Sequence, residues 1–195
     1  MKHLIRLFST AYARGTRNYI STQKKYEILR TLLFFGLSAA LYIAGYVTTQ
    51  TNKNLLTVVA VLGCLPASKS LVSAIMFLRY KSCNEEAATR IEQHMEGLQG
   101  LYDLVFTSQE RTYPVAHLTV KGNTLCGLSC TEQFPEQDFQ KHLTGLLKKD
   151  GYTEVNVKIF TSADKYCNRL DQMKELECDE KNTSGILQTL LSITL

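Results

Sequence analysis

Residues 31–49 read TLLFFGLSAALYIAGYVTT and contain no charged side chain. A helix over this stretch rises about 28 Å, close to the ~30 Å hydrocarbon core of a bilayer. Because backbone N–H and C=O groups in lipid need partners within their own segment, the stretch predicts a transmembrane helix. The competing interpretation is a buried helix of a soluble protein, and such helices are usually shorter.

A second apolar stretch covers residues 55–78, after a polar turn at residues 50–54. Together the two stretches predict a transmembrane hairpin over residues 31–80. Pro66 cannot donate a helical hydrogen bond, which predicts a kink. Lys69 lies about 21 Å from the outer end, so its side chain can reach the inner headgroups by snorkelling. A charge within a span is also a functional candidate, but we favour the snorkelling interpretation.

The charges are distributed unevenly along the chain. Residues 1–30 hold seven Lys or Arg and one acid (+6), and residues 31–80 add three basic residues (+3). Residues 81–195 hold 12 basic and 17 acidic residues (−5). Five Lys or Arg residues closely precede the first span, two follow the second, and the turn between the spans has only Lys53. The positive-inside rule therefore predicts a multi-pass topology with both termini in the cytoplasm. An acidic domain is repelled by phosphate backbones, so we expect no general nucleic-acid binding.

Residues 1–30 form a basic segment with one apolar helical face, which includes Leu4, Leu7 and Phe8. One interpretation is an amphipathic helix that lies on anionic lipid. Another is a mitochondrial transit peptide, which is rich in Arg and poor in acid, and which would place the protein in a mitochondrial membrane. We favour the interfacial helix, because residues 22–30 read as a continuation into the first span.

Small residues recur at every fourth position in both spans. Such stripes let helices approach closely in lipid, where no hydrophobic force drives their association. They predict that the two spans pack against each other, with contact between subunits as the alternative. The residues are Gly36, Ala40, Ala44 and Thr48 in the first span, and Ala60, Cys64 and Ser68 in the second.

Residues 81–195 predict a cytoplasmic α+β domain with the element order αβββαβα. Asn84 followed by two acids predicts a helix start, and Asp150-Gly151 predicts a helix end. The turn at residues 121–123 predicts a hairpin between its flanking strands. Apolar periodicity predicts helices at residues 84–99, 135–150 and 162–178, strands at 101–107, 115–120, 124–129 and 153–160, and a short docked helix in the tail 186–195.

The αβββαβ order over residues 84–160 resembles the restriction-endonuclease-like fold. The resemblance implies a metal site in which an Asp and an acid-x-Lys triplet hold an ion that activates water. Asp103 and Lys121 are the matching positions here, and Glu92 or Glu96 is a candidate acid from the first helix. Thr119 stands where the second carboxylate belongs, so the resemblance implies a degenerate, inactive relative.

Residues 54–70 read NLLTVVAVLGCLPASKS and resemble an uncharacterised family of two-span membrane proteins of Gram-positive bacteria. The resemblance extends over most of the chain. It implies a location in the plasma membrane and weakens the mitochondrial interpretation. It implies no particular activity.

The six cysteines contain no close pair of the kind that binds zinc, and a reducing cytoplasm disfavours disulfides. We expect no metal and no cofactor. The sequence predicts a membrane-anchored, non-enzymatic interaction or regulatory module, whose partners are the lipid bilayer and an unidentified protein or a second copy. One alternative is a membrane-tethered nuclease-like enzyme that uses Asp103, Lys121 and Glu92. Another is an oligomeric transporter or channel subunit that uses Lys69.

Overall fold

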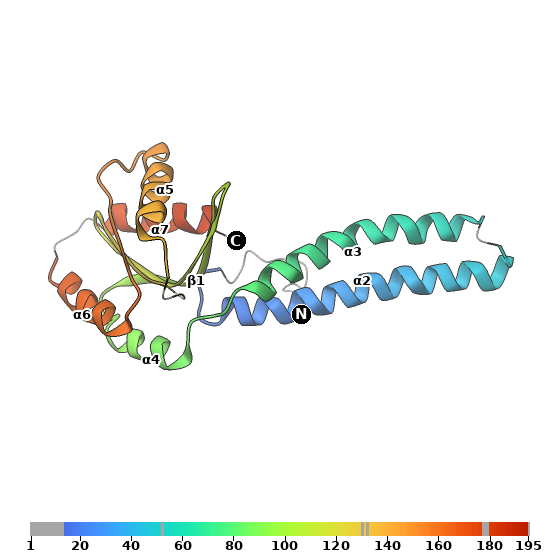
Figure 1. The fold of residues 1–195 in the computed structure, drawn as a ribbon, viewed down its shortest axis with the longest axis horizontal. Coiled ribbons are helices and arrows are strands. Elements are labelled where there is room, and N and C mark those ends of the chain that lie inside the picture. Colours follow the sequence, from blue (N-terminus) through green and yellow to red (C-terminus); the bar gives the residue numbers. More distant parts are fainter. Residues whose placement is uncertain (1–13, 52, 130, 132, 177–179, 195) are drawn as a thin grey trace. The chain divides into compact units, whose positions relative to one another are not determined.

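The computed structural model describes residues 14–194 except 52, 130, 132 and 177–179 (Figure 1). The described chain separates into two compact units, one made of residues 20–81 and the other of residues 14–19 together with 82–194. The interfacial helix predicted from Leu4, Leu7 and Phe8 lies outside the described residues.

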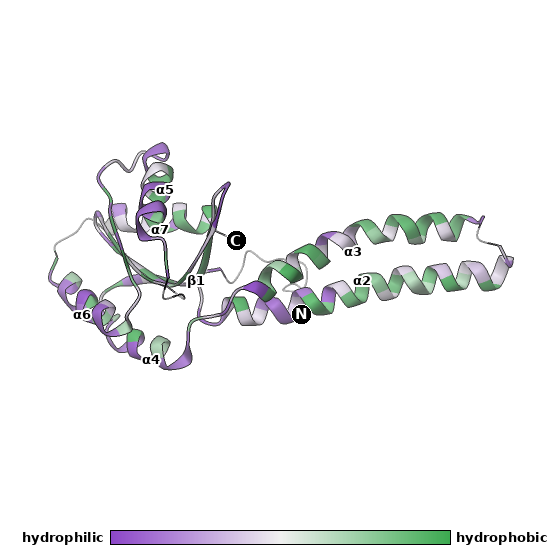
Figure 2. Ribbon diagram, viewed as in Figure 1, coloured by the Kyte–Doolittle hydropathy of each residue, from purple (hydrophilic) through white to green (hydrophobic). Residues whose placement is uncertain are grey.

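Two long apolar helices, α2 (Tyr19–Thr49) and α3 (Leu55–Arg79), form the first unit. Figure 2 shows that apolar residues cover most of both helices. The helix predicted over residues 22–30 and the apolar run 31–49 are parts of one continuous α2. The side chain of Asn54 caps α3 by accepting a 2.7 Å hydrogen bond from the amide of Thr57, and α3 continues past Pro66.

Buried small side chains spaced seven residues apart line the inner faces of the helical pair. A spacing of seven residues drifts only about 20° around a helix, so such a row stays on one face over several turns. Close approaches across the pair place Ser38 beside Gly63 and Gly45 beside Leu56. The buried residues are Thr31, Ser38 and Gly45 on α2, and Ala60, Ala67 and Ala74 on α3.

The predicted stripe of Gly36, Ala40 and Ala44 lies on the exposed side of α2, so the expectation that it packs against α3 is wrong. A Cβ added at Gly36 would meet nothing within 4 Å. A row at every fourth position drifts about 40° per step around a helix of 3.6 residues per turn, and therefore leaves the contact face. On α3, Ala60 is buried and Cys64 half-buried.

The second unit contains helices and one sheet in the order αβββαβαα, which is the predicted order αβββαβα followed by the predicted tail helix. The tail helix begins at Glu180, well before residue 186, and the first helix ends at Gln93, earlier than residue 99. Gly97, with a left-handed φ of 72°, lies in the turn between that helix and the first strand. The elements are α4 (Glu85–Gln93), β1 (Gln99–Thr107), β2 (Thr112–Lys121), β3 (Thr124–Ser129), α5 (Glu136–Lys149), β4 (Asn156–Phe160), α6 (Ala163–Lys174) and α7 (Glu180–Ile193).

The four strands follow the spatial order β1-β2-β3-β4. β1, β2 and β3 are antiparallel neighbours, and β4 lies parallel to β3 after the crossover through α5. Helices α5 and α7 cover one face of the sheet, and α4 and α6 cover the other (Figure 1). Each face buries its own apolar core, which includes Phe106 and Phe139 on the α5/α7 side, and Ile91 and Leu170 on the α4/α6 side.

Strands β1 and β2 both change face at Asp103 and Ala116. The pairs Tyr102–His117 and Leu104–Val115 flank these two residues, and the register of β2 against β3 shifts at the same level. Asp103 has a φ of 54°, a backbone conformation that interrupts the regular alternation of a strand. As a result, His117 joins Ala116 on the α4/α6 face, where the two would otherwise lie on opposite faces.

Candidate functional site

The three residues predicted to serve a nuclease-like site have three different partners. The Asp103 carboxylate accepts a 2.8 Å hydrogen bond from the backbone amide of Cys83. The Lys121 ammonium donates a 2.6 Å hydrogen bond to the carbonyl of Lys174, and the Glu92 carboxylate lies 2.9 Å from the Arg17 guanidinium. Asp103 lies level with residue 116 on β2, about 17 Å along the strand from residue 121. Each of these side chains thus has a structural partner of its own.

A closed polar network lies between the sheet and helix α6. The Tyr166 hydroxyl is 2.7 Å from His117 Nδ1 and 2.9 Å from Thr119 Oγ1. All three side chains are fully buried. The Tyr102 ring packs against the His117 ring at a centroid distance of 4.2 Å, with the two planes tilted by 53°. Thr119 also contacts the sulfur of Met95 at 3.6 Å.

Burial dominates the electrostatics of this network. It lowers the pKa of His117 to about 3, so the imidazole is neutral at physiological pH. It raises the pKa of Tyr166 well above its ordinary value. Among the described residues, His117 Nε2 has no hydrogen-bond partner, whichever ring nitrogen carries the proton. A Cβ at Gly100 would come within 2.7 Å of that nitrogen, so the His117 ring packs directly on the glycine.

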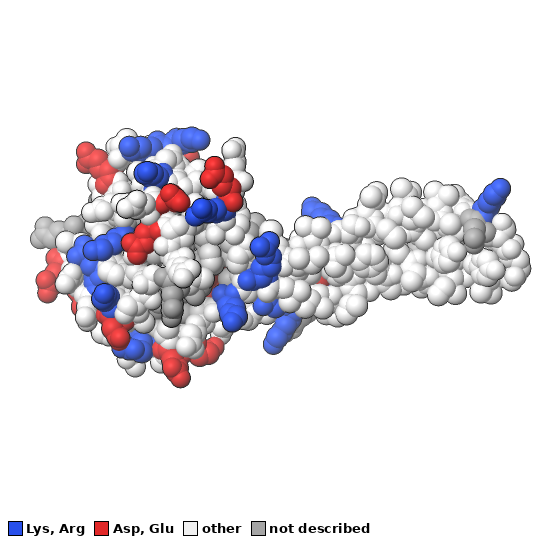
Figure 3. Space-filling view, in the orientation of Figure 1, with Lys and Arg blue, Asp and Glu red and all other residues white. Residues whose placement is uncertain are grey.

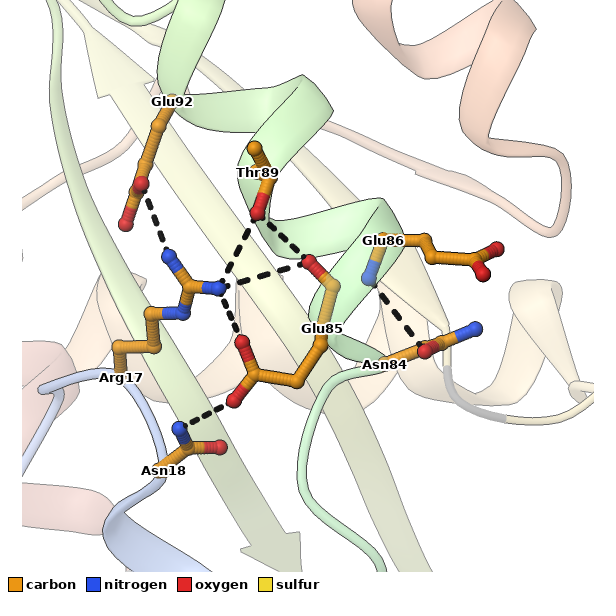
Figure 4. Close-up of polar contacts among 7 residues, drawn as sticks. All are labelled: Arg17, Asn18, Asn84, Glu85, Glu86, Thr89 and Glu92. Carbon is orange, nitrogen blue, oxygen red and sulfur yellow. Dashed lines mark hydrogen bonds and ion pairs between the residues drawn. The ribbon is translucent and has the colours of Figure 1, made fainter.

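A second polar cluster fastens residues 14–18 to helix α4 (Figure 4). The Arg17 guanidinium forms ion pairs with Glu85 and Glu92, and it donates a 3.2 Å hydrogen bond to Thr89 Oγ1. Asn18 Nδ2 donates a 2.7 Å hydrogen bond to the Glu85 carboxylate. Arg17 thus contacts three side chains that lie along one side of α4.

The electrostatics and backbone contacts of residues 14–18 agree with a fixed attachment. Hydrogen bonds from Asn18 and then Arg17 lower the pKa of the Glu85 carboxyl, and the bond to Glu85 raises the pKa of Arg17. The Gly15 carbonyl accepts a 2.8 Å hydrogen bond from the amide of Tyr102 on β1. No sequence pattern predicts this cluster, because Arg17 and Glu85 are 68 residues apart.

The described cysteines are all free thiols. Cys83, Cys126 and Cys167 are buried and Cys64 is half-buried, while Cys130 and Cys178 lie outside the described residues. Burial raises the pKa of Cys83 to about 11, which keeps the thiol protonated. In the part of the chain that the structure describes, no three His, Cys, Asp or Glu side chains are arranged as metal ligands.

A polar cluster also lies between the two long helices. The buried Glu27 carboxylate pairs with the Arg30 guanidinium at 2.5 Å and accepts a 3.2 Å hydrogen bond from Gln23. Arg30 Nε donates a 3.2 Å hydrogen bond to Ser70 Oγ, which also lies 3.0 Å from Thr31 Oγ1. The i, i+3 spacing of Glu27 and Arg30 was the sequence signal for this pair, which our sequence analysis missed.

The predicted membrane-embedded residue Lys69 precedes Ser70 on α3 and is exposed. Its side chain therefore lies outside the polar cluster of Glu27, Arg30 and Ser70. A pathway that uses Lys69 would require further copies of the helical pair, because two helices enclose no channel.

A cavity of about 260 Å³ lies beside β4, the last strand of the sheet order. Its lining contains one carboxylate, that of Glu136, and one ammonium group, that of Lys158, and the other side chains that line it are uncharged. The lining residues are Glu136, Gln140, Asn156, Val157, Lys158 and Ile159.

Comparison of the chain with protein-family models, curated proteins and solved structures finds no match.

Proposed function

We propose that this chain is a two-span protein of the plasma membrane whose α+β domain lies in the cytoplasm and acts by binding a partner, not by catalysing a reaction. The exposed apolar surface of the two long helices carries the proposal. Among the described residues, every large apolar side chain that is markedly exposed lies on α2 or α3, except Leu176.

The exposure of these helices supports a membrane hairpin over a pair of soluble core helices. Only 17% of the most apolar window of each helix is buried, whereas a core helix is mostly buried. Contact with water costs about 25 cal/mol for each Å² of apolar surface, so lipid is the medium that fits this surface. The basic residues support the orientation, because Lys25, Arg30 and Arg79 lie near one end of the pair and only Lys53 lies at the turn.

The structural partners of the domain's polar residues support binding as its mode of action. The Asp103 carboxylate accepts a hydrogen bond from the Cys83 amide, and the Lys121 ammonium donates one to the Lys174 carbonyl. His117 is neutral and fully buried. The order αβββαβ from α4 to β4 supports the resemblance to the restriction-endonuclease-like fold. Within that fold, the domain would be a relative that uses these positions for stability.

Thiol labelling in intact cells tests the topology. Lys53→Cys places a thiol in the turn, and a membrane-impermeant maleimide should label it from outside. Glu86→Cys, at an exposed position on α4, is the matched control and should be labelled only after permeabilisation. Labelling of the wild-type protein gives the background that its natural cysteines contribute. Labelling of Glu86→Cys in intact cells, or release of the chain from membranes by alkaline carbonate, contradicts the proposal.

A nuclease assay on the full-length protein in detergent separates binding from catalysis. We expect the same background cleavage of DNA and RNA with Mg²⁺ or Mn²⁺ for the wild type and for Asp103→Asn. Cleavage that disappears in Asp103→Asn would instead favour the nuclease-like alternative.

Site-specific photocrosslinking from exposed positions of the domain tests partner binding. It should yield a discrete adduct with a protein partner or a second copy.

A further inference from the structure

One end of the helical pair carries exposed basic side chains that no acid of the same unit balances. Lys25, Lys69 and Arg79 are exposed, and they lie in the halves of α2 and α3 that are remote from the turn. Glu27 is the only acid in residues 20–81, and it is buried and paired with Arg30. The exposed surface at this end is therefore positively charged. We call Lys25, Lys69 and Arg79 the basic collar.

Contacts between α2 and α3 fix the position of the collar residues along the helix axes. Arg30 Nε lies 3.2 Å from Ser70 Oγ, and Lys24 Nζ lies 3.2 Å from the carbonyl of Tyr80, so residues 24–30 and 70–80 run alongside each other. Helix α3 rises about 21 Å from Leu55 to Lys69 and about 36 Å to Arg79. A bilayer has a ~30 Å hydrocarbon core within a total thickness of about 40–45 Å. If Leu55 marks the outer edge of the core, Arg79 reaches the inner headgroup layer. Lys69 lies about 9 Å short of that layer, and its side chain can extend toward the layer by snorkelling.

Exposed apolar side chains lie between two of the collar residues on α3. Val72 is 64% exposed, Ile75 52% and Leu78 54%, and all three lie between Lys69 and Arg79. A surface that mixes large apolar groups with ammonium and guanidinium groups is typical of the interface between headgroups and acyl chains. In Figure 3, the middle of the helical pair is white and blue side chains occur toward its two ends.

We propose that the basic collar binds the headgroups of anionic phospholipids in the leaflet that surrounds this end of the pair. The inference rests on the proposed membrane insertion and adds a lipid preference to it. Anionic headgroups supply the negative charge that the unit itself lacks, and basic residues near such a surface gain attraction from it. Zwitterionic headgroups carry no net charge and offer no equivalent gain.

The test uses the full-length protein in liposomes that contain equal amounts of phosphatidylglycerol and phosphatidylcholine. Spin-labelled forms of the two lipids report, by electron spin resonance, which lipid is immobilised at the protein surface. We expect wild-type protein to favour phosphatidylglycerol about threefold or more in 20 mM salt. The preference should approach one in 0.5 M salt, because that ionic strength screens exposed charges.

Two variants place the preference at the collar. Lys25→Gln/Lys69→Gln/Arg79→Gln should lose most of the preference for phosphatidylglycerol. Lys53→Gln, the matched control at the turn, should keep it. Equal association of both lipids with wild-type protein at low salt overturns the inference, as does wild-type preference in the triple variant. The salt series uses wild-type protein alone, so it does not depend on how the triple variant folds.

Alkaline carbonate extraction of the same liposomes separates the two proposals. Protein that resists extraction but shows no lipid preference contradicts the basic collar and leaves membrane insertion intact. Protein that carbonate releases contradicts the membrane hairpin itself.

Discussion

The carboxylate of Asp103 and the backbone amide of Cys83 lie 2.8 Å apart, and this hydrogen bond joins β1 to the segment that leads into α4. Both residues are buried. The bond satisfies an amide that would otherwise lose its hydrogen bond to water, and it fixes the point at which β1 changes face. Asp103 was selected from the sequence as a candidate metal ligand, and its contacts give it a structural role.

Replacing Asp103 should separate hydrogen bonding from charge. Asn keeps an accepting oxygen and tolerates a positive φ, so Asp103→Asn should change the free energy of unfolding by less than about 1 kcal/mol. Asp103→Ala should lower it by about 2–4 kcal/mol, because the Cys83 amide loses its acceptor and a left-handed Ala is strained. Urea unfolding in detergent, followed by tyrosine circular dichroism, measures both. An Asn variant as unstable as the Ala variant would refute this explanation.

Removing the Arg17 side chain should loosen residues 14–18 from α4. In Arg17→Ala, the amide of Tyr102, which is bonded to the Gly15 carbonyl, should exchange its hydrogen about two- to fivefold faster. High salt should produce part of this effect in the wild-type protein, since the ion pairs with Glu85 and Glu92 are exposed. Arg90→Ala removes the exposed ion pair with Asp164 and is the control. Equal exchange at Tyr102 in both variants would show that Arg17 does not hold the segment.

His117 should make the domain sensitive to acid. An unfolded His has a pKa near 6.5 and folded His117 one of about 3, so between these values the unfolded chain binds a proton that the folded chain does not. This contribution to stability is complete above pH 6.5 and is lost as pH falls toward 3. From pH 7 to 4.5, the wild type should lose about 3 kcal/mol more unfolding free energy than His117→Phe, as measured by urea unfolding. Parallel pH profiles for the two proteins would contradict the lowered pKa.

Local sequence patterns predicted the elements well, because each element leaves a signal in adjacent residues. The apolar runs gave both long helices, and the turn at residues 121–123 gave the β2–β3 hairpin, with β3 at 124–129 as expected. The sequence predicted two C-terminal helices, at residues 162–178 and 186–195. Their bounds were less accurate, because α6 ends at Lys174 and α7 begins at Glu180.

Contacts between distant residues could not be predicted in this way. His117 and Tyr166 are 49 residues apart, and their contact depends on the face change at Asp103 and Ala116. Nothing in the run of apolar residues around 103 indicates a positive φ. The packing face of α2 was mistaken for a different reason, because a row of small residues was selected at a spacing of four without following its drift around the helix.

The packing around Gly100 should leave no room for a side chain at this position. A Cβ there would lie 2.7 Å from His117 Nε2 and 2.9 Å from Met95 Cε, so Gly100→Ala should lower the unfolding free energy by about 1–3 kcal/mol. Gly145→Ala, in the interior of α5 with nothing within 4 Å of the new Cβ, should raise it by about 0.5–1 kcal/mol. In a His117→Ala background, Gly100→Ala should cost less. An undiminished cost in that background would show that the clash is not with His117.

The corrected packing face predicts which glycines of the helical pair tolerate a side chain. A Cβ at Gly63 would lie 2.6 Å from Ser38 Oγ, so Gly63→Val should push α3 away from α2 and lower the melting temperature in detergent by several degrees. Gly36→Val adds the same side chain on the exposed side of α2 and should leave the melting temperature within about 2 °C of wild type. Thermal unfolding of the full-length variants, followed by helical circular dichroism, measures both. Greater damage from Gly36→Val than from Gly63→Val would restore the stripe of Gly36, Ala40 and Ala44 as a contact face, either within the chain or between two copies of it.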